Sequence, residues 1–221
     1  MTLIAPAVAE IESEFHVGYS SDYIFRGTNN TPSDDDDLYE FGLDFAGSGT
    51  VPGLGDVDWS AGLWYASFGS NELDVYGEVS KSLNEMFSVA VGITNYSYFG
   101  ESDDNVADDI EPYISLGANV GEISLGVGAH FDESDNREHD IYWEFTAAYE
   151  KELSGNMTLG LSAVLGHFDE EDDGFDTYYG LSAALSIAAS DDITVTPHIT
   201  HIFDGKDGAE TFGGVSVGFG F

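Results

Sequence analysis

The chain has 221 residues, no cysteine and a formal net charge of -37, because 42 Asp and Glu oppose five Lys and Arg. This charge repels phosphate and excludes nucleic acid as a partner. The absence of cysteine excludes disulfides and thiolate metal sites. An aromatic content of 14% distinguishes the chain from disordered acidic proteins, which are poor in aromatic residues.

The first residues, 1–9, end in Ala7-Val8-Ala9, the small-residue pattern that precedes a signal cleavage site. We interpret them as the remnant of a secretory signal, with a simple flexible leader as the alternative. Residues 10–221 are predicted to form one domain. No apolar run of about 18 residues follows, so no helical membrane span is expected.

Alternation of period two then recurs through the whole chain, broken by turn residues. The strand count is even and most strands have a length suited to crossing a bilayer at a tilt. The sequence therefore predicts a twelve-stranded antiparallel up-and-down transmembrane β-barrel, with a soluble acidic β-sandwich as an alternative. The predicted strands are 14–26, 38–46, 57–68, 73–82, 87–99, 110–119, 123–131, 141–151, 157–168, 175–187, 193–203 and 210–221.

The two faces of these strands differ in a way that favours the barrel. In 123–131 the large apolar residues share one face and the other carries Gly, Ser and His. A membrane barrel turns large apolar residues to lipid and small or polar residues to the lumen, where carboxylates stay wet. The Gly and Ser lining predicts a lumen that is not plugged by side chains. The predicted pore-lining residues are Asp22, Arg26, Glu40, Asp44, Asp58, Asp74, Glu78, Glu111 and Glu144.

Arg26 is one of only five basic residues and is expected near the outer rim, close to Asp22. It could form a charge pair with Asp22 that narrows or orients the pore. Alternatively, it could neutralise neighbouring carboxylates of the wall and stabilise the barrel.

Each odd-numbered strand ends in a phenylalanine that precedes a polar loop. These loops hold more than half of the 42 acidic residues, as expected for the longer outer loops of such barrels. We therefore predict an aromatic girdle at this rim, built from Phe25, Phe68, Phe99, Phe131, Phe168 and Phe203.

Two positions are expected to interrupt regular strand pairing. Pro197 lacks an N–H inside the eleventh strand, and a local bulge is the simplest accommodation. Strict alternation from Leu165 turns Phe168 to the lumen, so a bulge or an end of pairing is expected near Gly166.

The stretch YSSDYIFRG at 19–27 resembles the signature of the bacterial TorF-type porin family. The matching residues are Tyr19, Ser21, Asp22, Tyr23, Phe25, Arg26 and Gly27. The resemblance implies an outer-membrane β-barrel of poorly defined transport function. The resemblance does not identify a transported substrate.

The run LGHFDEEDDG at 165–174 suggests a divalent-cation site because carboxylate oxygens alternate before a glycine. An EF-hand is excluded, since its twelfth position is Gly180 instead of Glu. We predict at most loose binding of Ca²⁺ or Mg²⁺ at Asp169, Glu171 and Asp173. The histidines lack metal-ligand spacing and no nucleophile motif is present, so an enzyme is not expected.

Together these features predict a porin-like channel in the outer membrane of a Gram-negative cell. It would pass small cationic or neutral solutes passively and prefer cations because its lumen and outer loops are acidic. The alternative is a non-conducting surface barrel whose loops bind divalent cations, lipopolysaccharide or a partner. Expected neighbours are outer-membrane lipid, lipopolysaccharide and further copies in a homo-oligomer.

Overall fold

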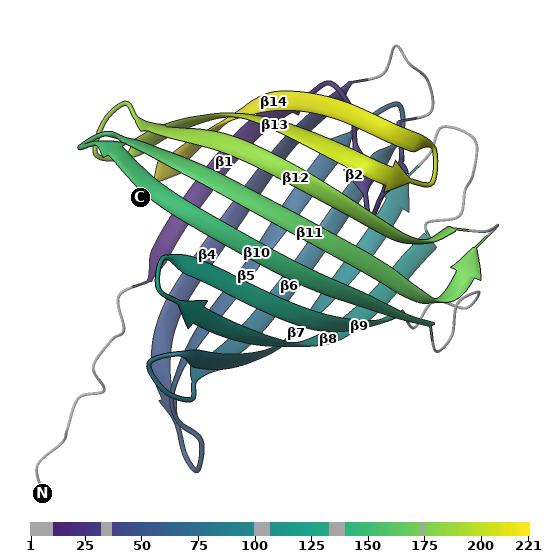
Figure 1. Cartoon of the computed structure of the whole chain (residues 1–221). Helices are drawn as coiled ribbons and strands as arrows, with labels where there is room; N and C mark the ends of the chain where they lie inside the picture. Colours follow the sequence, from purple (N-terminus) through teal and green to yellow (C-terminus); the bar gives the residue numbers. More distant parts are fainter. Residues whose placement is uncertain (1–10, 32–36, 100–106, 133–139, 173–174) are drawn as a thin grey trace, which may run out of the picture.

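The computed structural model describes residues 11–31, 37–99, 107–132, 140–172 and 175–221. Twelve of its strands form a closed antiparallel barrel in which sequence neighbours pair and β14 closes on β1. Figure 1 shows the strands tilted around a common axis. This confirms the predicted fold class. The barrel strands are β1 (Glu12–Ser20), β4 (Leu38–Val51), β5 (Gly55–Ser67), β6 (Asn71–Ser82), β7 (Phe87–Phe99), β8 (Ala107–Val120), β9 (Ile123–Asp132), β10 (Asp140–Ser154), β11 (Met157–Asp172), β12 (Phe175–Ala188), β13 (Ile193–Gly205) and β14 (Gly208–Gly220).

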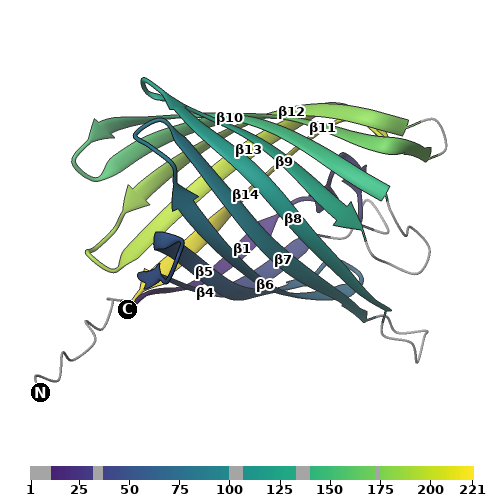
Figure 2. The ribbon, with the colours of Figure 1, turned by 90° about the horizontal axis from the view of Figure 1, so that it is seen from below.

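The two ends of the barrel differ in their longest connections, since seven residues separate β7 from β8 and β9 from β10 at one end. Connections of two to four residues join β4 to β5 and each later even-numbered strand to the next strand. We call their end the turn end and the opposite one the loop end. β1 begins and β14 finishes at the turn end (Figures 1 and 2). No helix among the described residues is long and apolar enough to cross a membrane.

The first strand ends earlier than predicted. β1 stops at Ser20 instead of residue 26, and the Ser21 N–H donates to the Gly213 carbonyl at 3.0 Å. The chain then forms a separate two-stranded hairpin, β2 (Ile24–Phe25) with β3 (Thr28–Asn29). We call residues 21–31 the inner hairpin. A continuous alternating pattern concealed this change of direction.

The outer face of the barrel is apolar. Val91, Ile114 and Leu181 are each about half exposed, and exposed large apolar side chains of this kind recur on every barrel strand except β5. A soluble protein rarely exposes so much contiguous apolar surface, whereas lipid would cover it. The single closed sheet also rules out the sandwich alternative.

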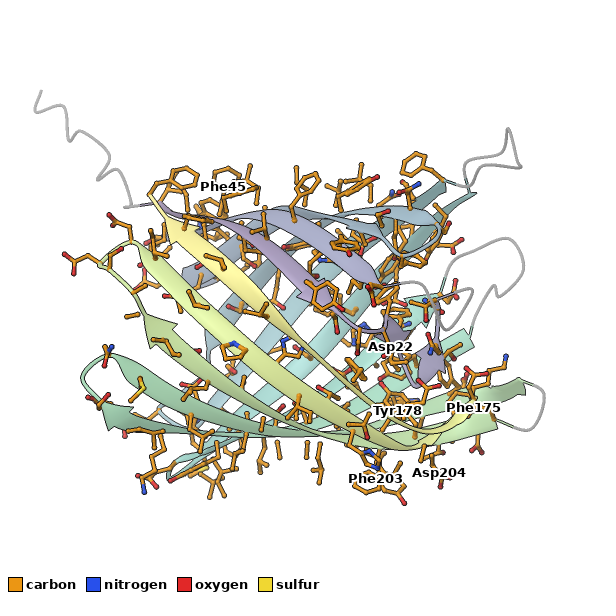
Figure 3. The ribbon with its side chains drawn as sticks, turned by 90° about the horizontal axis from the view of Figure 1, so that it is seen from above. Asp22, Phe45, Phe175, Tyr178, Phe203 and Asp204 are labelled. Atoms are coloured by element: carbon orange, nitrogen blue, oxygen red, sulfur yellow. The ribbon has the colours of Figure 1, made fainter. Side chains whose placement is uncertain are left out.

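Aromatic side chains on this outer face gather near both ends of the barrel. At the loop end Tyr19 packs on Tyr39 at 5.5 Å and Tyr179 on Phe203 at 5.1 Å, measured between ring centroids. At the turn end Phe15 stacks on Phe219 at 6.1 Å. Figure 3 shows Phe45 and Phe203 on the outside, toward opposite ends. Such belts suit the two interfaces of a bilayer.

The six exit phenylalanines do not form one girdle, so that prediction was wrong in part. Phe99 and Phe203 are outward and 37% exposed. Phe68 is buried at 5%, and Phe168 packs inside against Tyr142 at 5.0 Å. The inward phenylalanines support the inner hairpin instead of facing lipid.

Pairing is interrupted at both expected positions, but a bulge does not form at Pro197. The β12–β13 register is the same at Ala184–His198 and Ile187–Val195, on both sides of Pro197, so the predicted bulge is absent. Between these two positions, two residue pairs of β12 and β13 form no bridge, and the missing N–H of Pro197 is accommodated there. Regular pairing of β11 with β12 does end at His167, as expected, and Phe168 lies inside.

Candidate pore and its inner hairpin

The inner hairpin is built around a two-residue turn, Arg26-Gly27. Both residues have positive φ, 49° and 78°, as a type I′ turn requires. A Cβ on Gly27 would lie 2.6 Å from the Tyr178 ring, so glycine is needed for both conformation and space. The sequence Phe25-Arg26-Gly27-Thr28 therefore encodes a tight hairpin that lies close to the barrel wall.

Arg26 at the tip of this hairpin is fixed by Glu111 of β8. Its Nη1 and Nη2 atoms each donate to one carboxylate oxygen at 2.6 Å, and the guanidinium lies 4.1 Å from the Tyr142 ring centroid. Burial lowers the pKa of Arg26, but the hydrogen bonds and charge of Glu111 outweigh it and the pKa is raised. Arg26 does not pair with Asp22, which accepts from the Ser21 hydroxyl at 2.9 Å.

The inner hairpin contacts strands all around the barrel. Tyr23 packs on Phe68 and Trp64, beside β5, at 4.7 and 5.6 Å between centroids. Next to β13 the Gly27 carbonyl accepts from the Lys206 N–H at 2.8 Å. Figure 3 shows Asp22 and Tyr178 within this end of the molecule. The hairpin thus lies across part of the lumen near the loop end, and whether the lumen is open stays a prediction.

The carboxylates predicted on the strands point away from the apolar outer face. Several accept hydrogen bonds from wall aromatics: Glu40 from Trp64 Nε1 at 2.6 Å, Asp44 from the Tyr76 hydroxyl, and Glu78 from Tyr113 at 2.8 Å. These bonds hold the carboxylates against the wall of the lumen.

The remaining predicted residues are spread along the lumen. Glu144 accepts from the Tyr142 hydroxyl at 3.2 Å, and Asp58 lies farther toward the turn end, opposite Ser80. Asp74 is 9% exposed beside the hairpin. The structure therefore collects Asp22, Arg26, Asp74 and Glu111 at the hairpin and leaves the other predicted residues along the wall. Their role in lining a pore stays a prediction.

Sequence reasoning missed Glu72, which it assigned to a loop. Among the described residues Glu72 is the most buried charged one, 1% exposed, and neither of its carboxylate oxygens has a hydrogen bond of standard geometry. Its spacing of two from Asp74 on β6 places both on the lumenal face. The alternation in NELDVYGEV could have revealed this pairing.

Glycines of the lumenal face make room for large neighbours. Gly62 lies under the Tyr76 ring and Gly92 under the Tyr113 ring, each directly across the strand pair. The tyrosines lie flat along the wall because no Cβ obstructs them. The glycine-rich face therefore reflects packed tyrosines as well as open space.

Beneath the hairpin, toward the turn end, the lumen contains a cavity of about 560 Å³. Its polar lining comes from β6 to β10 and includes Glu78, Tyr113, His130 and Glu144. His130 also contacts Glu111 at 3.1 Å, which links the cavity to the hairpin tip. The cavity could hold a small hydrated solute among acceptor groups.

The acidic run at the end of β11 is described only in part, so the metal site predicted there stays a prediction. Asp169 accepts from the Ile141 N–H at 2.8 Å. The side chain of Glu171 and all of Asp173 lie outside the described residues, as do residues 1–10. Within the described part of the chain, no group of three or more His, Asp and Glu side chains is arranged to hold a metal ion.

A family model covers residues 6–212 of the chain. The chain belongs to the family described as "Bacterial protein of unknown function (Gcw_chp)". No curated protein matches it. The family description does not carry the TorF-type name, which stays a prediction.

Solved structures of outer-membrane barrels are similar to the whole chain. The KdgM porin is 14% identical with a TM-score of 0.56, and the match covers 95% of this chain and 99% of that one. A COG4313 outer membrane channel from Pseudomonas putida F1 is 10% identical, with a TM-score of 0.56 and coverages of 98% and 97%. Outer membrane phospholipase A from Escherichia coli is 13% identical, with a TM-score of 0.54, and the match covers 93% of this chain and 92% of that one. At these identities the likeness shows the fold alone.

Proposed function

We propose that this protein is a porin-like channel of the Gram-negative outer membrane that passes small solutes passively and prefers cations. The observation that carries the proposal is the row of carboxylates on the lumenal face, Glu40, Asp44 and Glu78 among them, held in place by wall aromatics. Such a wall raises the local concentration of cations and repels anions. Similarity in fold to porins supports a channel.

The acidic lumen also sets a substrate class. The KdgM porin has been solved in complex with disordered oligogalacturonate, an anionic saccharide. In this chain Glu111 already neutralises Arg26 at the hairpin, so the described lumen offers an anion little attraction. Small cations and neutral solutes are therefore the proposed cargo.

A second candidate is a non-conducting barrel whose loops bind divalent cations, lipopolysaccharide or a partner. The inner hairpin favours it, because the hairpin leaves the wall at β1 and reaches across the lumen to Glu111 of β8. Similarity to a phospholipase adds no catalytic residues to this chain, and we propose no enzymatic activity.

Planar-bilayer recording separates the two candidates. Purified, refolded protein should give unitary currents with a reversal potential displaced toward that of the cation in a KCl gradient. A variant without residues 23–29 is the matched test of the hairpin. If the wild-type protein gives no current and the deletion variant conducts, the binding candidate is favoured. A reversal potential displaced toward that of the anion would refute cation preference.

A further inference from the structure

A pair of buried carboxylates on β6, Glu72 and Asp74, has no explained partner. Glu72 is 1% exposed and Asp74 is 9% exposed. Three of their four carboxylate oxygens, Glu72 Oε1 and Oε2 and Asp74 Oδ1, are buried without a hydrogen bond of standard geometry, although the Tyr23 and Tyr98 hydroxyls lie close to Glu72. Burial of unpaired carboxylates is strongly unfavourable, so the pair must bind either protons or a cation.

The surroundings of this pair are aromatic and hydroxylic. Glu72 is opposite Tyr98 and Asp74 opposite Tyr96 on β7. Tyr23 of the inner hairpin covers the pair, and its pKa is raised by burial and by the nearby charges of Glu72 and Asp74. Arg26, the basic residue at the hairpin tip, already donates to both carboxylate oxygens of Glu111.

We propose that Glu72 and Asp74 bind one divalent cation, of the Ca²⁺ class, beneath the inner hairpin. The two residues are about 7 Å apart along one face of β6, a spacing that lets two carboxylates converge on one ion. A charge of +2 neutralises both carboxylates together. Ca²⁺ prefers oxygen ligands in flexible geometry, which tyrosine hydroxyls and water can complete.

This site differs from the cation site predicted at Asp169, because it lies inside the barrel and includes the hairpin. Ion binding would draw Tyr23 and the strand together and hold the hairpin in the lumen. The proposal does not depend on conduction, since binding can be measured on the folded protein alone.

The test is calcium-dependent thermal stability of the refolded, EDTA-treated barrel in detergent, followed by circular dichroism. CaCl₂ should raise the apparent Tm of wild type relative to NaCl at equal ionic strength. The double variant Glu72→Gln, Asp74→Asn should lose most of this shift. The matched control Glu40→Gln, Asp44→Asn removes the same charge from β4 and should keep it.

Two results would overturn the proposal. One is a calcium shift that is equal in wild type and in the Glu72→Gln, Asp74→Asn variant, which would assign the shift to the loops. The other is absence of any shift in wild type together with a higher Tm of that variant, which would mean that protons neutralise the pair. Equilibrium dialysis with ⁴⁵Ca²⁺ should independently show one fewer bound ion in this variant than in the control.

Discussion

Arg26 and Glu111 are 85 residues apart in sequence, yet the guanidinium and the carboxylate form two hydrogen bonds of 2.6 Å within the barrel. Side chains of the pair are 14% and 5% exposed. Planar, bidentate pairing of this kind is available to arginine and not to lysine. The pair is therefore the contact that fixes the tip of the inner hairpin to the wall.

Replacement of Arg26 should release the hairpin. Arg26→Ala leaves Glu111 buried without its arginine partner and in contact with His130 and Tyr96, and we expect the free energy of unfolding to fall by about 3–5 kcal/mol. Arg26→Lys should recover only part of this loss. Urea unfolding in detergent micelles, followed by tryptophan fluorescence, measures the change. Equal stability of Arg26→Ala and wild type would contradict this role, and Lys151→Ala, at an exposed position, is the control.

The turn residue Gly27 should be equally sensitive, for a different reason. Gly27→Val introduces a Cβ 2.6 Å from the Tyr178 ring at a φ of 78° that valine avoids. The hairpin should leave its site, and unitary conductance should rise. Gly49→Val is the matched control, because no atom lies within 4 Å of that Cβ position. Unchanged conductance in Gly27→Val would mean that the hairpin does not constrict the pore.

Substitution of Gly92, on the lumenal face, tests how the tyrosines pack against the wall. Gly92→Ala places a methyl group in the Tyr113 ring and should break the Tyr113–Glu78 hydrogen bond of 2.8 Å. We expect a loss of stability of about 1–3 kcal/mol from overpacking. Gly77→Ala, whose Cβ would meet its nearest atom at 3.7 Å, should be nearly neutral. Similar unfolding curves for both variants would contradict the packing argument.

Most of the barrel could be predicted from the sequence, because alternation between an apolar and a polar face is imposed by the lipid on every strand. All twelve strands and the lumenal register of residues such as Glu40 and Glu78 follow from that one constraint. The inner hairpin could not be predicted in this way. Its residues Tyr23, Ile24 and Phe25 are as apolar as a lipid-facing strand, although they pack inside the barrel.

The sequence also could not predict which residues contact one another in the candidate site. Arg26 was expected near Asp22 because the two are close in the chain, whereas barrel closure brings Glu111 to it from β8. Glu72 was missed because its strand was predicted to start at residue 73. In both cases the decisive contacts are set by tertiary structure and not by local pattern.

Neutralising wall carboxylates should reduce ion selectivity. In the triple variant Glu40→Gln, Asp44→Asn, Glu78→Gln the cation-to-anion permeability ratio should fall toward one. The control Glu85→Gln, Glu122→Gln, Glu152→Gln removes an equal charge at exposed positions of the turn end and should change the ratio less. A larger effect in the control would place selectivity at the turn end.

The reversal potential of the wild-type channel in a planar bilayer under a KCl gradient tests the central claim most directly. We predict a reversal displaced toward the potassium equilibrium potential, with the displacement decreasing at high ionic strength as salt screens the wall charges. A reversal toward the chloride equilibrium potential, or no current from folded protein, would contradict the account.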